Sequence, residues 1–140
     1  NLSSKKSNLI INEMGLNSLS PNPDVFLGGP VQMNRGLFLH SCDYANEDSK
    51  IVSKSISITS NKEIISDLNS GKGPNKFRLT FGYAGWGENQ LEREYENGDW
   101  LLLPANPGFI FDTPDKIKWD EAAKSFGIDI LDISGNTGIS

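Results

Sequence analysis

The sequence predicts an α+β protein, and three observations support that class. Residues 77–83 alternate between bulky and smaller side chains, which is typical of a strand. Residues 113–127 carry helix start and stop signals around an apolar stripe. Strand-like and helix-like stretches interleave irregularly along the chain, which favours α+β over a regular parallel sheet. At 140 residues, the chain suits a single domain over 1–140.

The first part of the chain predicts three strands. A polar start leads into the apolar run 9–11, which indicates a buried strand. Two prolines within 18–24 indicate a loop. Strands over 25–27 and 35–40 follow, and the second carries bulky residues on both of its faces. We therefore expect it to be covered on two sides.

The middle of the chain predicts a strand, a helix and a second strand. Residues 51–59 indicate a half-buried strand. Ser60 and Glu63 have the spacing of a capping box, and the helix that they begin ends near Gly71. In the strand over 77–83, four aromatic and aliphatic side chains share one face.

A helix over 89–98 is expected to follow the glycine-rich bend. Asn89 is placed as its cap, and Leu91 and Tyr95 are four residues apart and would form its buried stripe. An interior strand over 99–105 is then expected from the run DWLLLPA.

The C-terminal part of the chain predicts a helix with clear start and stop signals. After a turn at 106–108, Thr113 can cap a helix with Pro114 at its first position, and Gly127 closes it. Its apolar stripe is Trp119, Ala122, Ala123 and Phe126. Residues 128–130 indicate a final short strand.

The bend GYAGWGENQLERE, residues 82–94, raises the question of a phosphate site. Its spacing G-x-x-G-x-G is not the dinucleotide fingerprint, and no GK[ST] follows. Between Glu88 and Asp99 five acids face Arg93 alone, so a phosphate would meet carboxylates. We therefore expect a structural corner, whose glycines allow positive φ angles and close packing under Trp86.

The acids after the bend offer a possible cation site. Glu88, Glu92 and Glu96 are four residues apart and would line one side of a helix. A solvated helix face explains the same spacing, with Glu92 occupied at the helix cap, and nothing resembles a calcium loop. We expect no metal and no cofactor.

The single histidine limits the enzymology that this chain could carry. His40 and Cys42 are two apart and would share a strand face, so a nucleophile pair is conceivable. No nucleophile motif surrounds Cys42, and G-x-S-x-G is absent. A hydrogen-bonded structural role for His40 is favoured, and no catalytic residue is assigned.

Three other residues are candidates for ligand binding. Arg35 could clamp a carboxylate or phosphate, although an internal ion pair is favoured. Tyr83 and Trp86 could form a stacking platform, although aromatic residues beside glycines more often close the edge of a core.

Composition restricts the partners and the compartment. The net charge of −5 disfavours direct binding to nucleic acid and binding to an anionic membrane surface. Cys42 is the only cysteine, which fits the cytoplasm. The longest apolar run, around 101–103, is far too short for a membrane span, and no signal peptide is visible. The chain starts at Asn1, so upstream residues could carry a further segment.

The chain resembles the AlgH/YqgE family of bacterial proteins over nearly its whole length. The stretches that carry the resemblance are LIIN (9–12), FLGGPVQMNRGLFLH (26–40), SITS (57–60), LTFGYAGWGENQLEREYENGDWLLLPA (79–105), FDTPDKIKWDEAAKSFGID (111–129) and SGNTG (134–138). Members carry a further N-terminal segment, which this chain is expected to lack. The usual GA-x-GL-IIN approach reads SKKSNLIIN here.

The resemblance implies a fold and a few shared residues. The fold is α+β, with a bent, bifurcated mixed β-sheet forming a partial barrel and about three helices packed on it. Members are mostly uncharacterised, and their recurring label is transcriptional regulator. The residues carried over as the shared surface are Gly28, Gly29, Pro30, Arg35, His40, Gly82, Tyr83, Gly85, Trp86, Gln90, Leu91, Glu92, Trp100 and Pro104.

Two functions follow as hypotheses. The first is a cytoplasmic interaction or regulatory protein that contacts partner proteins and has no catalysis of its own. The alternative is a small-molecule binder or hydrolytic enzyme with a pocket near Arg35, His40 and Trp86. The oligomeric state is not predicted.

Overall fold

A computed structural model describes residues 3–104 and 106–127 of the chain. The chain divides into two compact units, Asn1–Leu101 and Leu102–Ser140, which are described separately. The first unit contains a five-stranded sheet, and the second contains two helices.

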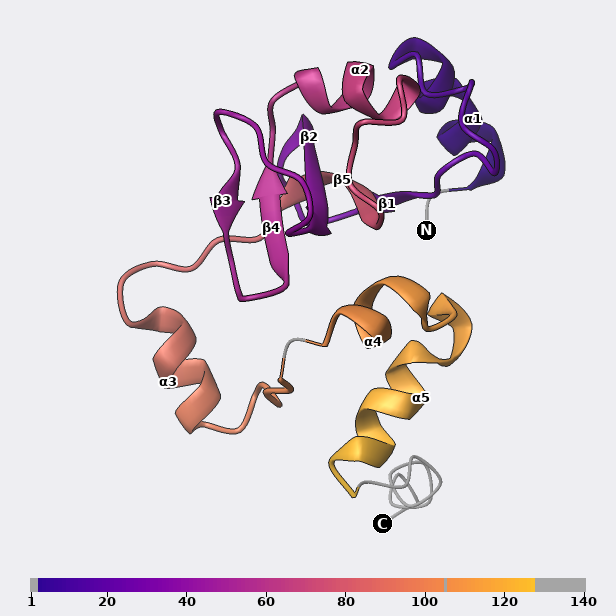
Figure 1. Ribbon diagram of the computed structural model, residues 1–140. Coiled ribbons are helices and arrows are strands. Elements are labelled where there is room, and N and C mark those ends of the chain that lie inside the picture. Colours follow the sequence, from indigo (N-terminus) through magenta and orange to yellow (C-terminus); the bar gives the residue numbers. More distant parts are fainter. Residues whose placement is uncertain (1–2, 105, 128–140) are drawn as a thin grey trace. The chain divides into compact units, whose positions relative to one another are not determined.

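The sheet of the first unit is mixed, with strand order β1-β5-β2-β4-β3 (Figure 1). β1 runs parallel to β5, and all the other neighbours are antiparallel. The sheet is not closed into a barrel. The strands are β1 (Val25–Leu27), β2 (Val31–Ser41), β3 (Lys50–Ile51), β4 (Ile56–Thr59) and β5 (Phe77–Tyr83).

Five helices occur in the described residues, where the sequence predicted about three. The first unit holds α1 (Ser4–Glu13), α2 (Glu63–Asn69) and α3 (Gln90–Glu96). The second unit holds α4 (Pro107–Asp112) and α5 (Asp115–Ser125). Helices and a mixed sheet together confirm the α+β class.

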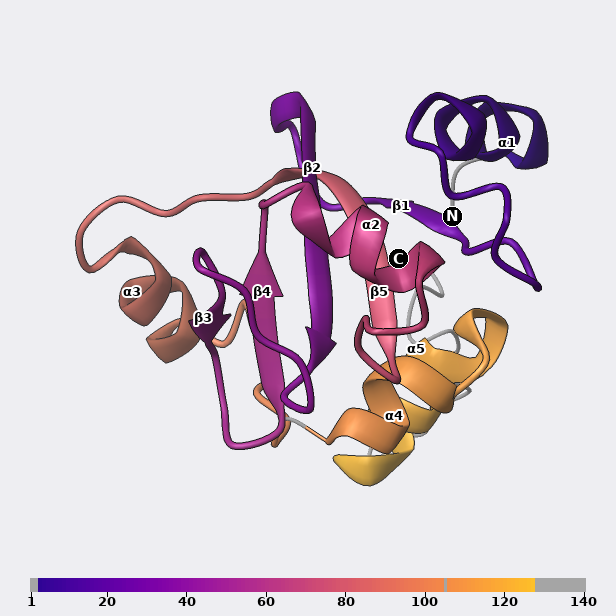
Figure 2. The ribbon, with the colours of Figure 1, turned by 45° about the horizontal axis from the view of Figure 1, so that its top comes forward.

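The core of the first unit lies between the sheet and the helices α1 and α2 (Figure 2). Both helices contribute to one apolar cluster with residues of β1, β2 and β5, so both cover the same face of the sheet. The buried members of this cluster are Ile11, Leu16, Val25, Phe38, Tyr44, Ile64 and Leu79.

The predicted strand over 9–11 is wrong, because these residues belong to α1. In a strand Leu9 and Ile11 would share a face, but Leu9 is 59% exposed and Ile11 only 1%. Ser7 and Ile11, four residues apart, form the buried side of the helix. A run of three apolar residues fits either a strand or a helix, so its length alone could not decide.

Three of the predicted strands are confirmed, two with the predicted bounds and one with an earlier start. β1 and β5 have the predicted bounds, and β2 starts four residues earlier than predicted. The single strand predicted over 51–59 is instead the hairpin β3–β4. Its turn is closed by the amides of Val52 and Ser53, which both donate to the Ile56 carbonyl. No glycine or proline marks this turn, so the sequence pattern did not reveal it.

The capping box predicted for α2 does not form. The helix begins at Glu63, whose amide donates to the side chain of Asn61 over 2.9 Å. The Ser60 hydroxyl instead accepts a hydrogen bond from Arg35. Asn61 therefore accepts the backbone hydrogen bond from Glu63 that the sequence analysis assigned to Ser60.

The interior strand predicted over 99–105 is also wrong. Residues 99–104 have no regular secondary structure, and Trp100 to Leu103 are 39–59% exposed. An apolar run becomes an interior strand only where neighbouring strands pair with it, and none of the strands β1 to β5 pairs with this run in the described residues.

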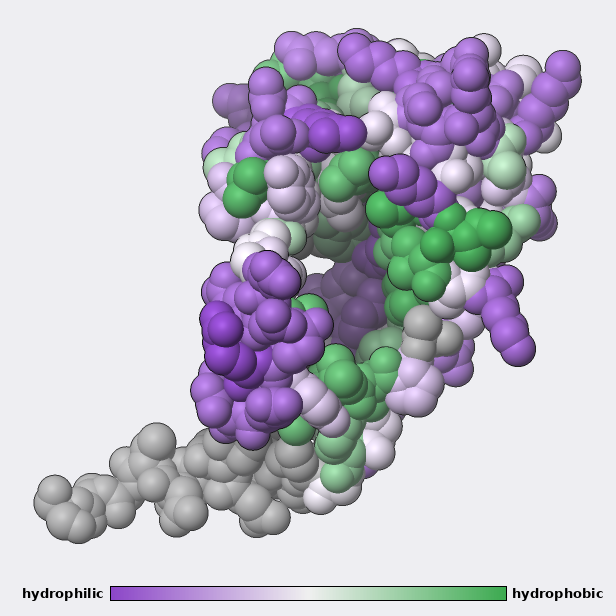
Figure 3. All heavy atoms as spheres, turned by 90° about the vertical axis from the view of Figure 1, so that its left-hand side faces the viewer, coloured by the Kyte–Doolittle hydropathy of each residue, from purple (hydrophilic) through white to green (hydrophobic). Residues whose placement is uncertain are grey.

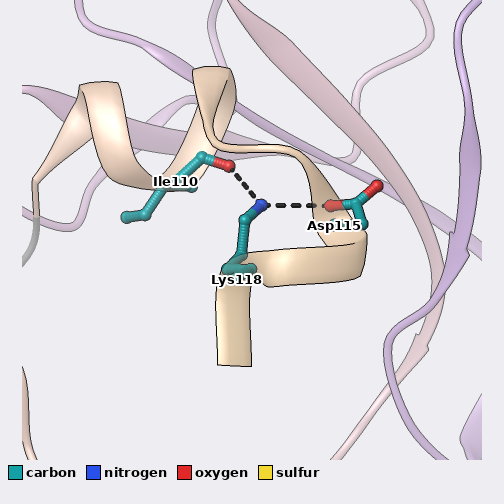
Figure 4. A network of polar contacts seen from close by, with 3 residues as sticks. All are labelled: Ile110, Asp115 and Lys118. Carbon is teal, nitrogen blue, oxygen red and sulfur yellow. Dashed lines mark hydrogen bonds and ion pairs between the residues drawn. The ribbon is translucent and has the colours of Figure 1, made fainter. Parts of the chain in front are cut away.

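The second unit is an α4–α5 helical hairpin joined at Thr113. The sequence missed α4, which Asn106 caps by accepting a hydrogen bond from the Phe109 amide. Lys118 of α5 donates to the Ile110 carbonyl of α4 over 2.8 Å, which ties the two helices together, and to Asp115 of its own helix over 3.1 Å (Figure 4).

The predicted final helix is confirmed as α5, with two differences. Thr113 ends α4, and Pro114 takes the N-cap position. Within the predicted stripe Ala123 is buried, whereas Trp119 is 73% exposed and Phe126 43%. The strand predicted over 128–130 lies outside the described residues.

Candidate functional site

Arg35 stands at the wall of a hollow of about 380 Å³ in the first unit. Its guanidinium donates to the Ser60 hydroxyl over 3.2 Å and to the Gln32 side chain over 3.4 Å. Because β2 and the chain leading into α2 meet here, they place Arg35 beside Ser60. The hollow is lined by Met14, Asn34, Arg35, Gly36, Phe38, Ser60, Lys62 and Phe81.

The charges in this hollow, which we call the Arg35 hollow, are all positive. Arg35 and Lys62 line it, and none of its lining residues is acidic. The internal ion pair predicted for Arg35 does not form with any carboxylate among residues 3–104 and 106–127. The guanidinium is therefore oriented by two neutral acceptors, and its charge is not neutralised by them.

A second hollow of about 410 Å³ shares Arg35 and Ser60 with the first. Glu47 and Asp48 line it together with Ser49 and Lys50. Arg35 and Ser60 thus separate a hollow with only cations from one of mixed charge.

His40 is fully buried within the first unit. Its Nδ1 lies 2.9 Å from the Ser41 carbonyl and therefore acts as the donor, and its ring meets Tyr44 edge-on at 5.5 Å. Its Nε2 has no hydrogen-bond partner in the part of the chain that the structure describes. The Cys42 sulfur lies 3.2 Å from the Ser57 hydroxyl. His40 thus has one ring nitrogen engaged internally, and its structural role stays a prediction.

The strand register separates His40 from the other candidates. His40 pairs with Phe77 at the start of β5, whereas Val31 pairs with Tyr83 at its end. Six residues of strand span roughly 20 Å at a rise of about 3.3 Å per residue. Arg35 lies toward the Tyr83 end, about 17 Å from His40 along β2 by the same rise. The structure does not bring His40 to the Arg35 hollow.

Three of the predicted structural glycines lie where two backbones approach closely. A Cβ at Gly28 would overlap the Gly82 carbonyl, and one at Gly82 would overlap the Gly29 carbonyl. Gly82 also has a φ of +73°, which side chains rarely adopt. Gly85 differs, because a Cβ there would meet only the Tyr83 ring at an ordinary 3.7 Å. Of the corner residues 82–87, only Gly82 needs glycine for its backbone angle.

The segment after this corner is held by Glu94, a residue that the sequence analysis missed. Glu94 Oε2 accepts from the indole nitrogens of Trp86 (2.9 Å) and Trp100 (2.8 Å). The two rings meet edge-on at 5.7 Å. Hydrogen bonds from Trp100, Gln90 and Trp86 lower the pKa of Glu94.

Gln90 completes this arrangement. Its Nε2 donates to Glu94 Oε1 over 2.9 Å, and its own Oε1 accepts from the Gly87 amide over 3.0 Å. The Gly87 amide is therefore engaged internally and does not point at an anion. Gln90 and Glu94 are four residues apart on α3, and that spacing was the available sequence signal.

α3 buries none of its side chains, so the predicted buried stripe of Leu91 and Tyr95 is wrong. Leu91 is 38% exposed and Tyr95 49%, beside Trp86 at 38% and Trp100 at 44%. We call these four residues the α3 surface. Asn89 holds the N-cap position with a φ of +55° and makes no side-chain cap bond, and Glu92 is exposed.

On the face drawn in Figure 3, hydrophobic residues lie among polar ones. Within the described residues, no three His, Cys, Asp or Glu side chains group as a metal site. No described helix is both long and apolar enough to span a membrane.

Comparisons with known proteins agree with the fold and the motifs. Residues 3–131 match the sequence model of the AlgH-like family (DUF179). A UPF0301 protein of Jannaschia sp. is 42% identical over 121 residues, covering 85% of this chain and 63% of the relative. One of Nitrosococcus oceani is 42% identical over 114 residues, covering 81% and 61%. The chain thus spans about three fifths of the length of these relatives.

A solved structure shows the same fold. The solution structure of AlgH from Pseudomonas aeruginosa matches with a TM-score of 0.66 and 28% identity, covering 91% of this chain and 71% of that one. The family match covers far more than half of the chain. This protein therefore belongs to the AlgH-like family, the UPF0301 proteins, as its motifs predicted.

Proposed function

We propose that this protein is a cytoplasmic regulatory protein without catalysis of its own, and that it contacts a partner protein through the α3 surface. The observation that supports this most strongly is that α3 buries none of its side chains while two tryptophans beside it are hydrogen-bonded to one carboxylate. The proposal of a cytoplasmic location is supported by the single cysteine.

A helix of seven residues is not stable by itself in water. Here Glu94 links Trp86 and Trp100, which lie before and after the helix, and so closes the segment around α3. Aromatic side chains that are fixed before binding lose little conformational entropy when a partner arrives. Tryptophan and tyrosine also dominate the binding energy of many protein interfaces.

The charge around the α3 surface restricts the partner. Between Glu88 and Asp99 there are five acids and one arginine, a local charge of −4. A duplex nucleic acid or an anionic lipid would be repelled by this rim. A protein with an apolar pocket bordered by lysine or arginine would be attracted to it. The regulator role that the family resemblance implies would then operate through a protein contact.

Site-specific photocrosslinking tests the proposal. A photoreactive phenylalanine derivative replaces Tyr95, and in a control variant it replaces Ile51, which is 81% exposed on β3 outside the α3 surface. After irradiation in cells of the source organism, we expect one dominant protein adduct from position 95. Its yield should fall with added salt and with a Trp100→Ala substitution.

Two results would contradict the proposal. One is an equal set of adducts from positions 95 and 51, which would show that the α3 surface has no selectivity. The other is tight, salt-sensitive binding of the purified protein to duplex DNA, because that would require the opposite charge.

A further inference from the structure

We propose that the Arg35 hollow binds a small organic anion, with a carboxylate or phosphate group at Arg35 and Lys62 and an apolar body over the aromatic floor. The inference shares no residue with the α3 surface and does not depend on the proposed function. It keeps Arg35 from the alternative hypothesis of a ligand site and leaves His40 out. The strand register places His40 toward the other end of β2.

The first argument is charge. Arg35 and Lys62 line one hollow without an acidic residue, and neither is paired with a carboxylate in the described part of the chain. Both cationic groups are exposed to solvent, so an anion that arrives from solution can reach them. No carboxylate of the lining competes with that anion.

The second argument is geometry. The guanidinium carries five N–H donors, and its bonds to Ser60 and Gln32 occupy two of them. The acceptors lie on β2 itself and on the chain before α2, so they orient the planar group from two sides. The guanidinium fork matches the two oxygens of a carboxylate or phosphate.

The third argument is the floor of the hollow. Phe38, which is 2% exposed, lies beneath it with Phe81 and Met14. Gly36 adds no side chain there, so the hollow keeps its volume of about 380 Å³. This volume falls within the range of small-molecule sites, which combine apolar walls with a few polar groups.

The second hollow, which also contains Arg35, differs from the first in the charge of its lining. Glu47 and Asp48 line it, and an anion placed there would face two carboxylates. The anion is therefore expected on the Lys62 side of Arg35 and not on the Glu47 side.

The test uses benzoate and phenyl phosphate as probes, with neutral benzamide as the control of similar shape. Each is titrated into the full chain while amide NMR signals are recorded. We expect saturable shifts at Gly36, Ser60 and Lys62 for at least one of the two anions. Binding of benzoate alone would identify a carboxylate ligand, binding of phenyl phosphate alone a phosphate ligand, and binding of both a general organic-anion site.

Arg35→Gln removes the charge and keeps a polar, though shorter, side chain. It should weaken binding about tenfold or more, the size expected for losing a charge-assisted contact. Arg93→Gln makes the same charge change on α3 and should leave the affinity unchanged. If Arg35→Gln does not fold, Lys62→Gln replaces it, because Lys62 is exposed and makes the second cationic contact.

Three outcomes would overturn the proposal. They are the absence of saturable shifts up to tens of millimolar anion, equal binding of benzamide, and equal affinities of the Arg35→Gln and Arg93→Gln variants. None of these results would affect the α3 surface, so the two proposals can fail separately.

Discussion

Replacing Tyr44 by phenylalanine is expected to destabilise the protein at neutral pH and to change how its stability depends on alkali. Tyr44 is 8% exposed, and its hydroxyl donates to Asp67 of α2 over 2.7 Å. This bond ties α2 to the loop that follows β2. Since Ser60 and Lys62 lie directly before α2, the bond also supports one wall of the Arg35 hollow.

The size of the effect follows from the hydrogen bond and from the pKa. Loss of the bond should lower the free energy of unfolding by about 1 kcal/mol at neutral pH. Burial, and then the bond to Asp67, raise the pKa of Tyr44 from 10.0 to about 12. The folded state therefore holds the phenol proton more tightly than the unfolded state does.

The sign follows from this difference. The stabilisation from the phenol is complete below pH 10.0 and is lost as the pH rises toward about 12. At about 1.36 kcal/mol per pH unit, the wild type loses roughly 1.4 kcal/mol over the first unit and up to about 2.7 kcal/mol over both. The Tyr44→Phe variant has no such group and lacks this part of the loss.

Denaturant unfolding of both proteins, measured from neutral pH into this alkaline range, checks the prediction. The two stability curves should converge and then cross as the pH rises, because a wild-type loss of up to about 2.7 kcal/mol exceeds the initial difference of about 1 kcal/mol. Tyr83→Phe is the control, because it removes a phenol outside this contact and keeps the bond between Tyr44 and Asp67. Parallel curves for the wild type and Tyr44→Phe would refute the reasoning.

Three further predictions concern the corner, the first helix and Glu94. Gly82→Ala should cost roughly 2–4 kcal/mol of unfolding free energy because of its positive φ and the backbone overlap, whereas Gly85→Ala should stay within about 0.5 kcal/mol; equal costs in denaturant unfolding would disprove the close approach. Ile11→Ala should lower the free energy of unfolding by about 2–4 kcal/mol and Leu9→Ala by under about 1 kcal/mol, since the two side chains differ in burial. Similar losses would favour the predicted strand over the helix. Glu94→Gln should shift both indole NMR signals of the α3 surface, because one amide oxygen cannot serve three donors. In the wild type the same signals should move as the pH falls through the lowered pKa of Glu94, and unchanged spectra in either case would count against the hydrogen-bonded arrangement.

Local patterns in the sequence were sufficient for several elements. The alternation of bulky and smaller side chains over 77–83 predicted β5 with its bounds, because such alternation is typical of a strand. Pro114 and Gly127 located the two ends of the final helix, since the signals that begin and end a helix are short-range, although Thr113 does not cap it. The motifs also identified the family.

Short apolar runs were less informative. Residues 9–11 and 99–105 were both interpreted as strands, and neither forms one where the structure describes them. Whether an apolar run becomes a helix or a strand depends on which partner buries it, and that partner lies elsewhere in the chain.

For the candidate site too, some features could be predicted from the sequence and others needed the structure. The sequence by itself determined the α+β class and the family, and it named Arg35, Gly82 and Trp86 as candidates. Only the tertiary structure placed His40 away from Arg35, put Lys62 beside it, and gave Glu94 its two indole donors. The physical reason is that strand register and long-range hydrogen bonds bring together residues whose separation along the chain carries no signal of their contact.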